Sequence, residues 1–421
     1  MVLAALMVRL IVVAFVFRDQ TDPTDHHAQF GWEMGWVARS IVQGHGFSSP
    51  FFPATGPTAL MPPLFPCLLA GVFRIFGLYT SKAALAILSI NSLFSALTCI
   101  PIYFSTRYSL GNRLSVLTGW VWVVYPFAIY FSADRIWDYS LTCLLFTTCF
   151  LMAQRLHGQR HHLAWLGFGA LYGVTALSNP SVLSMFPVFL VLAIVHIRQL
   201  KGRWVLNNLA AVLGLFVVLA PWIVRNYRVL QVVTPVRDNF WLEFWPGNNG
   251  NTFESNDHLA RPPSGPIELQ RFVLVGERSY LDQVRAQSVN FIRHHPVQFI
   301  EYSLHRAVCY WTGYWSLSSA YLRDQPTEIP NIFLTITITL FMLRGARRFW
   351  DDDKTVALPY LAAIAVFPLT YYATHVIPDY RQPIEPEIVV MAVAGALSLR
   401  DRLKIDKVAE REERLTVMVT A

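Results

Sequence analysis

Charged side chains are scarce in this sequence: Asp, Glu, Lys and Arg make up 14% of its 421 residues. A soluble globular protein carries roughly 25% charged residues, so the chain has too few charges to coat a soluble fold of this length. Hydrophobic residues make up 54%, and they gather in runs that approach the roughly 20 residues needed to cross a bilayer. The composition therefore excludes a soluble fold and predicts an all-α polytopic membrane protein.

Motifs for nucleotide and metal chemistry are missing as well. No Walker motif and no dinucleotide fingerprint occurs, and Gly44-His45-Gly46 lacks the strand-to-helix context of a nucleotide loop. The five cysteines show no CxxC or CxxH pattern, which predicts apolar core residues. Histidine pairs occur at 161–162 and 294–295, but adjacent histidines on a helix point about 100° apart and rarely share a metal. These absences argue against the use of a nucleoside triphosphate and leave any metal ligands unknown.

Lysine and arginine lie in short clusters between the apolar runs, which is a topology signal rather than a nucleic-acid surface. The clusters are at 107–113, 155–162, 198–203, 344–354 and in the tail from 400. If all are cytoplasmic, an even number of spans separates each from the next, and about ten spans satisfy this. The predicted spans are 1–17, 83–103, 114–131, 137–153, 163–177, 182–197, 205–224, 332–343, 356–373 and 388–399. The first lacks a signal-peptide cleavage site, so we expect it to be retained.

Two further apolar stretches, Met61 to Leu78 and Val297 to Leu317, then lie on the outer side. The first contains three prolines and an arginine, and the second contains Glu301, His305 and Arg306. Such residues suit lipid-exposed spans poorly, so both stretches are predicted to lie in or dip into the outer interface. The alternative, that one or both span, would place the amino terminus or the fourth basic cluster outside, against the charge signal.

The expected organisation has four parts. Residues 1–224 form an N-terminal transmembrane module with a first outer loop at 18–82, and 225–328 form a small mixed extracytoplasmic subdomain with the interfacial helix. Residues 329–399 supply the C-terminal transmembrane helices, and 400–421 are a cytoplasmic tail. Loops longer than about 12–15 residues are usually functional or disordered, so the long outer segments are the expected place for function.

Unusual polar residues converge on that outer side. They are Asp19, Asp22, Asp25, Glu33, Asp134, Arg135, Asp138, Asn179, Arg225, His375, Asp379, Tyr380, Arg381 and Glu385. A carboxylate there can act as a general base, and an arginine can hold a phosphate through forked hydrogen bonds. The competing interpretation is a solvated loop charge or an interfacial anchor. Asp138 and Glu385 fit the interpretation as solvated loop charges less well, because each abuts an apolar run where an unpaired charge is costly.

The motifs that hold these residues resemble the GT-C superfamily of polytopic glycosyltransferases, especially bacterial relatives of protein mannosyltransferases and of the lipid A aminoarabinose transferase. They are GWEMGWVAR at 31–39 with GHGFS at 44–48, PPLFP at 62–66, Trp137-Asp138, PWIVRNY at 221–227, RDNF at 237–240 with Gly247-Asn248, and YRQPIEP at 380–386. The resemblance runs from about residue 20 to residue 390. It implies a polyprenyl-phosphate sugar donor, a glycan, lipid or protein acceptor, and inverting transfer on the extracytoplasmic face of the inner membrane.

The resemblance also implies roles. Glu33 would be the base and Asp138 would orient the acceptor or assist. In many relatives the acid lies about eight residues before the Ala-Arg pair, where this chain has Phe30, so Asp25 is the alternative base. Arg225 and Arg381 would meet the negative charge that develops on the leaving phosphate.

Asn179, His375, Tyr380 and Glu385 complete the predicted substrate site. Some relatives use a divalent cation and some do not, so that requirement stays open. Two rival functions also stay open: a transporter or flippase of lipid-linked sugars, and a non-catalytic membrane assembly protein. A transporter would usually place its polar residues near the bilayer midplane on broken helices.

Overall fold

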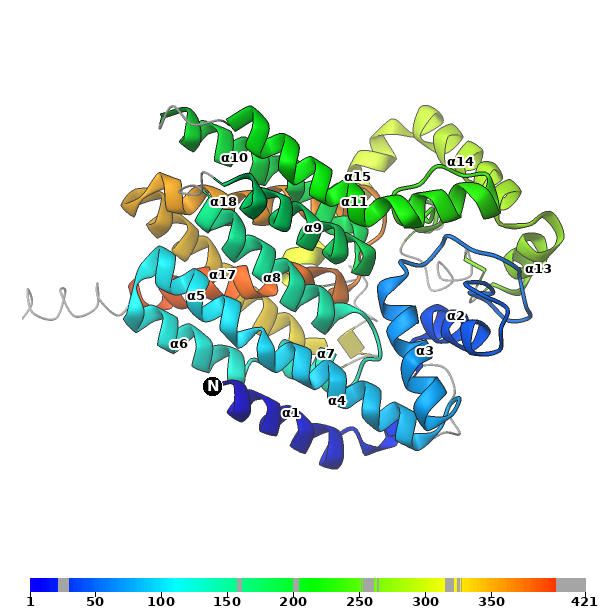
Figure 1. Ribbon diagram of the computed structural model, residues 1–421, viewed down its shortest axis with the longest axis horizontal. Coiled ribbons are helices and arrows are strands. Elements are labelled where there is room, and N and C mark those ends of the chain that lie inside the picture. The colour runs from blue at the N-terminus through cyan, green and yellow to red at the C-terminus, as the bar shows by residue number, and fades with distance from the viewer. Residues whose placement is uncertain are drawn as a thin grey trace, which may run out of the picture.

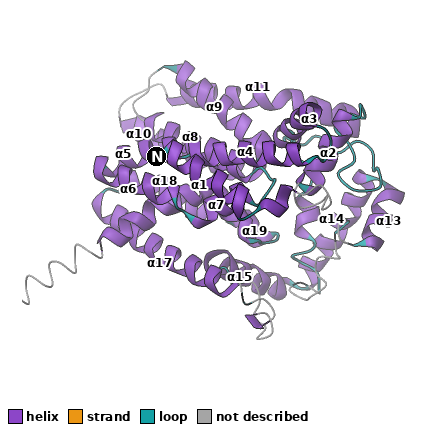
Figure 2. Ribbon diagram, turned by 90° about the horizontal axis from the view of Figure 1, so that it is seen from below, coloured by secondary structure: helices purple, strands orange, loops and turns teal. Residues whose placement is uncertain are grey.

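The computed structural model describes residues 1–21, 30–156, 161–199, 204–250, 252, 261–262, 265–314, 322–323, 326 and 328–398. Throughout these residues the architecture is helical and contains no strand, and Figure 2 shows only helices and loops. One isolated antiparallel bridge joins Ser48 and Pro57. The expected all-α fold class is therefore observed, and the described part of the expected mixed subdomain is helical.

A bundle of long helices fills most of the molecule (Figure 1). Its members are α1 (Val2–Phe15), α4 (Ser81–Leu97), α5 (Cys99–Leu110), α6 (Asn112–Val123), α7 (Pro126–Ala133), α8 (Tyr139–Leu156), α9 (His162–Ser178), α10 (Phe186–Gln199), α11 (Trp204–Leu230), α17 (Glu328–Asp352), α18 (Lys354–Val366) and a last helix over 385–398. Many bundle side chains that face outward are apolar; on α11, for example, Leu209, Leu213 and Val217 are each more than half exposed. A helix with such a surface is suited to lipid rather than to water.

Four helical stretches among the described residues are long and apolar enough to cross a membrane: Ser81–Leu110, Trp204–Leu230, Glu328–Asp352 and Lys354–Ala373. Helices α6 and α7, which meet at a bend of 44°, make a fifth if they count as one span. Shorter apolar helices occur at Val2–Phe15, Leu64–Phe76 and Pro180–Ile194. The chain is thus a multi-pass membrane protein, and the number of about ten spans stays a prediction.

Glycines let pairs of bundle helices approach closely. A Cβ on Gly169 of α9 would lie 1.8 Å from the carbonyl oxygen of Ala211 of α11, and one on Gly214 would lie 2.2 Å from that of Leu166. Small residues at such crossings allow backbone-to-backbone packing, which drives helix association in membranes. These contacts fix the end of α9 relative to α11, and both helices lead to the site described below.

A smaller lobe lies at one end of the bundle, at the right of Figure 1. It contains α2 (Trp32–Val42), α3 (Leu64–Phe76), α13 (Pro266–Val275) and α14 (Glu277–His294). The remaining elements are α12 (Phe240–Phe244), α15 (Pro296–Thr312), α19 (Leu369–Ala373) and the 3₁₀ turns η1 (Arg18–Thr21), η3 (Pro180–Met185) and η5 (Pro378–Ile384). The lobe thus combines two segments that are far apart in sequence, the first outer loop and the second.

A buried arginine ties these short elements together. Arg306 of α15 is 1% exposed. It donates hydrogen bonds to the carbonyl oxygens of Tyr372 and Gly247 and to Oδ1 of Asn248. A buried guanidinium is tolerated only when its donors are satisfied. These hydrogen bonds therefore explain how the charged Arg306 can be buried on an apolar helix. It holds the end of α19 against the loop that follows α12.

Candidate active site

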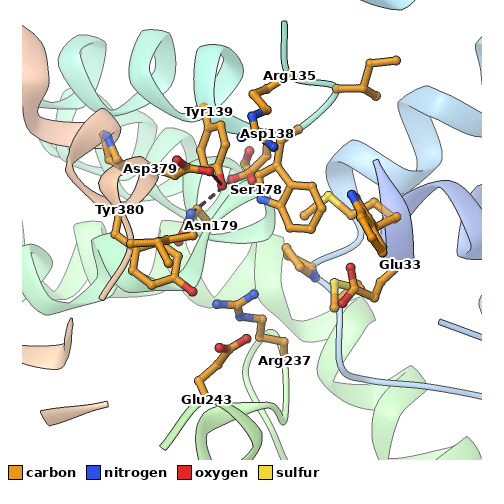
Figure 3. A pocket seen from close by; sticks show the side chains of 18 of the residues that line it. Glu33, Arg135, Asp138, Tyr139, Ser178, Asn179, Arg237, Glu243, Asp379 and Tyr380 are labelled. Carbon is orange, nitrogen blue, oxygen red and sulfur yellow. Dashed lines mark hydrogen bonds between the residues drawn. The ribbon is translucent and has the colours of Figure 1, made fainter. Parts of the chain in front are cut away.

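A cavity of about 310 Å³ lies where the lobe meets the bundle (Figure 3). Its walls come from the start of α2, the residues before α3, the link between α7 and α8, the end of α9, the region around α12, and η5. The polar residues that line it are Glu33, Arg135, Asp138, Tyr139, Ser178, Asn179, Arg237, Glu243, Arg261, Asp379 and Tyr380. Four residues predicted from the sequence, Glu33, Asp138, Asn179 and Tyr380, therefore meet at one cavity.

Asp138 lies directly before α8 and is 1% exposed. Its Oδ2 accepts hydrogen bonds from Thr142 Oγ1 at 2.8 Å and from Asn179 Nδ2 at 3.2 Å. Thr142 in turn shares a hydrogen bond of 2.8 Å with Ser178, so the end of α9 helps to fix the carboxylate. Burial raises the pKa of Asp138 to about 6, although these hydrogen bonds favour its ionised form. Both of these side-chain hydrogen bonds end on Oδ2.

Glu33 stands in the first turn of α2 and lines the same cavity. Burial raises its pKa, and the nearby charges of Arg261 and Arg237 offset this only in part. The turn that carries it is pressed against the α7–α8 link, because a Cβ on Gly31 would lie 2.8 Å from the carbonyl oxygen of Ile136. This close approach, which only glycine permits at φ +77°, places Glu33 and Asp138 on neighbouring walls.

Three arginines line the cavity, and two of them form ion pairs. Arg261 lies 3.3 Å from Glu243, and Arg135 lies 3.2 Å from Asp134. Burial raises the pKa of Glu243, but the positive charges of Arg261 and Arg237 outweigh it and bring the pKa below its ordinary value. Arg237 itself points into the cavity near Glu243 (Figure 3), and its guanidinium makes no ion pair or hydrogen bond within the described residues.

The turn η5 forms the wall opposite α2. Asp379 accepts a hydrogen bond of 2.7 Å from the hydroxyl of Tyr139, and burial raises its pKa. Tyr380 stacks on Tyr371 with ring centroids 4.5 Å apart. This wall therefore offers aromatic surface beside a carboxylate.

Arg381 and Glu385 lie on the far side of η5 and do not line this cavity. The guanidinium of Arg381 forms a forked pair with the carboxylate of Glu385, at 2.7 and 2.9 Å, and Tyr125 also donates to that carboxylate. Both charged residues are buried and border a separate space of about 20 Å³. The forked hydrogen bonds that the sequence predicted Arg381 to make to a phosphate are thus made to Glu385, one helical turn further along the chain. This pair holds η5 in place.

Arg225 is also occupied by the protein. Its two terminal nitrogens donate at 2.6 Å to the carbonyl oxygens of Thr58 and Phe47, and its guanidinium lies 4.9 Å from the ring centre of Trp222. Arg225 therefore clamps the first outer loop to the end of α11, outside the cavity lining.

His375 does not line the cavity either. Burial lowers its pKa to about 4, so it is neutral at pH 7. Asp25, the alternative base, lies outside the described residues.

No group of three or more His, Cys, Asp or Glu side chains is placed to hold a metal in the described part of the chain.

Several cavity residues were not among the predicted site residues: Arg135, Arg237, Glu243, Arg261 and Asp379. The sequence carried one signal for Arg237, because it opens the RDNF motif at 237–240 in the second outer segment. The others lie in outer segments without a pattern that distinguishes them from solvated charges.

Comparison with known proteins agrees with this architecture. Residues 61–224 match the family model of dolichyl-phosphate-mannose-protein mannosyltransferases. No curated protein is similar enough in sequence to be matched.

Among solved structures, the fold is similar to that of the Archaeoglobus fulgidus oligosaccharyltransferase in its apo form, with a TM-score of 0.52 and 13% identity over 98% of this chain and 52% of that one. The archaeal oligosaccharyltransferase AglB from the same organism, in complex with an inhibitory peptide and a dolichol-phosphate, gives a TM-score of 0.50 and 14% identity over 98% and 52%. This chain thus spans about half the length of that protein. ArnT from Cupriavidus metallidurans bound to undecaprenyl phosphate is matched over 93% of this chain and 77% of its own, at 14% identity, but its TM-score of 0.40 is too low to argue from. The comparisons thus show a family match over residues 61–224 and a similar fold over nearly the whole chain.

Proposed function

We propose that the chain is an inverting membrane glycosyltransferase that moves a sugar from a polyprenyl-phosphate donor to an acceptor on the extracytoplasmic face. The observation that carries this proposal is the cavity in which Glu33 and Asp138, two carboxyl groups of raised pKa, meet Arg237. Perturbed carboxyl groups beside an unpaired cation in a concave site are typical of catalytic centres. The matched family and the dolichol-phosphate bound to the archaeal relative support a lipid phosphate as the carrier.

In the proposed reaction, an acceptor hydroxyl or amine attacks the anomeric carbon of the donor sugar. A new bond from the acceptor to that carbon forms while the bond from carbon to phosphate oxygen breaks, and the configuration inverts. Glu33 takes the acceptor proton as general base, a task for which a raised pKa increases basicity. Asp138 orients the acceptor through the oxygen that Thr142 and Asn179 do not occupy.

The electron pair of the broken bond ends on the polyprenyl phosphate, so negative charge develops there. We assign the stabilisation of this charge to Arg237 in place of Arg225 and Arg381, because Arg237 faces the cavity and its fork is not occupied by described residues. Tyr380 and Asn179 remain candidates for substrate contacts at the cavity wall.

The orientation rests on the charge pattern. The basic clusters at 107–113, 155–162 and 344–354 are each separated from cavity residues by roughly one helix length of chain, and the positive-inside rule would place them in the cytoplasm. The cavity and the lobe would then face outward from the inner membrane. A cysteine at position 251 should react with an impermeant reagent from outside and one at position 201 should not; the reverse labelling would overturn this orientation.

The test of the function uses purified protein in lipid nanodiscs with a short-chain polyprenyl-phosphate mannose and a mannose oligosaccharide acceptor. Release of polyprenyl phosphate with elongation of the acceptor supports the proposal. Movement of the intact sugar-lipid across vesicles without cleavage would instead support a flippase. The wild type should be compared with Glu33→Gln, which removes the base with little change in shape.

A further inference from the structure

Trp32 has a backbone conformation that is rare for a large side chain. Its φ is +45°, directly after Gly31 at +77°. The left-handed region is unfavourable for any residue with a Cβ, and for a bulky one it is a genuine outlier. Such a conformation persists only where the surroundings enforce it, and it is concentrated at functional sites.

The surroundings of Trp32 do enforce it. The turn cannot move toward the α7–α8 link, because the position of a Cβ on Gly31 is 2.8 Å from the carbonyl oxygen of Ile136. Nor can it relax within itself, because a Cβ on Gly35 would lie 1.9 Å from the carbonyl oxygen of Phe30. The direction of the indole is therefore set by the packing of its neighbours.

The side chain of Trp32 is only partly buried. Trp32 is 40% exposed, whereas Phe30, two residues earlier, is 1% exposed. Trp32 lines the cavity beside Glu33, and Trp137 contributes a second indole to the lining. The fold thus holds a large, partly exposed aromatic surface at the edge of a site rich in carboxylates.

We propose that Trp32 is a stacking platform for a pyranose ring beside Glu33, and that it holds either the acceptor sugar with a hydroxyl toward Glu33 or the donor sugar with its anomeric carbon toward the acceptor group that Glu33 deprotonates. This inference rests on the proposed function and names the part of the site that recognises sugar. A pyranose has an apolar face of C–H groups and a rim of hydroxyls. An indole offers a flat apolar partner with few rotamers, and Glu33, Asp138 and Asn179 offer acceptors and donors to the rim. A lipid chain at the same place would desolvate those carboxylates without replacing their hydrogen bonds.

The sugar could belong to the donor or to a glycan acceptor, and the experiment separates these sources. The probes are a short-chain polyprenyl-phosphate mannose, the same lipid phosphate without sugar, and mannotriose. Binding is measured in nanodiscs for the wild type, Trp32→Gly and Trp32→Phe. Glycine removes the indole and accepts the left-handed backbone, while Phe keeps an aromatic face. The matched control is Gln231→Gly, because Gln231 has φ +55° at the end of α11, away from the cavity.

We expect Trp32→Gly to weaken binding of a sugar-bearing probe about tenfold, equivalent to roughly 1.4 kcal/mol, without lowering the melting temperature. Trp32→Phe should retain most of the affinity, and both Gln231→Gly and the bare lipid phosphate should show no change. If Trp32→Gly does not fold, Trp32→Asn gives the same measurement, since Asn tolerates this backbone.

Each outcome has a meaning. If Trp32→Gly weakens binding of the mannosyl lipid alone, the stacked ring belongs to the donor. If it weakens binding of mannotriose alone, the stacked ring belongs to the acceptor. Unchanged binding of both, or equal weakening of the bare lipid phosphate, overturns the platform and leaves the proposed function standing. A wild type that binds neither sugar probe overturns the platform, and one that also fails to bind the lipid phosphate overturns the proposed function as well.

Discussion

Replacing Arg237 should separate catalysis from stability, because the structure gives this arginine and Arg381 opposite surroundings. Arg237 lines the cavity and has no ion pair within the described residues. Arg381 is 5% exposed and donates twice to Glu385. Replacement of Arg237 should therefore lower the rate of transfer, because negative charge develops on the leaving phosphate. Replacement of Arg381 should instead lower the stability of the fold.

The magnitudes follow from these contacts. Removal of one donor aimed at developing charge costs about 10²–10³ in rate, which we expect for Arg237→Ala. Arg237→Lys keeps the charge but loses the fork, so we expect about a tenfold loss, or roughly 1.4 kcal/mol in the transition state. Arg237→Lys keeps the positive charge that faces the buried carboxylate of Glu243 and breaks no described side-chain contact, so its melting temperature should stay close to that of the wild type. Arg381→Lys should instead lower the free energy of unfolding by roughly 1.5–3 kcal/mol, the range for a hydrogen bond to a charged group.

The assay is single-turnover release of polyprenyl phosphate, with melting temperatures measured in the same detergent. Arg271→Lys is the matched control, because Arg271 bonds Gln283 on the exposed surface of the lobe. Wild-type turnover in both Arg237 variants would refute the phosphate assignment. Slow turnover of Arg381→Lys at an unchanged melting temperature would return that role to Arg381.

Four further results are expected. Glu33→Gln should lower transfer by roughly 10²–10⁴-fold in folded protein; full activity in this variant with loss in Asp25→Asn would identify Asp25 as the base. Transfer should fall as the pH drops through about 6, because burial raises the pKa of Asp138 to about 6 and the carboxylate is protonated below it; a pH–rate profile without this inflection contradicts the role. Since an exposed aspartate titrates near about 3.9, ionisation of Asp138 destabilises the fold as pH rises from about 4 to about 6, and Asp138→Asn should melt higher than the wild type above that range. Gly169→Ala should destabilise the bundle, because its Cβ would lie 1.8 Å from an α11 carbonyl, while Gly167→Ala on the same helix meets nothing within 4 Å and should not; equal melting temperatures would refute this packing argument.

The helices were predictable where an apolar run is long and uninterrupted. The run at 205–224 became α11, which ends at Leu230, and the run at 163–177 became α9. The run at 114–131 gave two helices, α6 and α7, that meet at 44°. Pro126 at the start of α7 explains the break, because it cannot donate the backbone hydrogen bond that a continuous helix requires. Local composition therefore predicts where helices form, but a bend depends on single residues.

The site was predictable to the extent that function needs a carboxylate at the membrane surface. Glu33 stands in the first turn of α2 and Asp138 directly before α8, and the structure brings both to one cavity. The roles of the arginines were harder to predict, because the sequence does not show which guanidinium is already hydrogen-bonded to other residues of the protein. Arg381 finds Glu385 four residues away, and Arg225 finds carbonyl groups of a loop more than 160 residues distant. Only the fold reveals the second contact.

The cavity has a consequence for biosynthesis. Its walls are drawn from almost the whole chain, from Trp32 to Pro383, and the last wall, η5, is anchored by Glu385 at the start of the final described helix. A nascent chain that has reached residue 370 already holds both carboxylates and Arg237 but lacks Asp379 and Tyr380. The cavity is therefore complete only after the segment that follows residue 378 has been made. We expect a chain that stops before this segment to be inert.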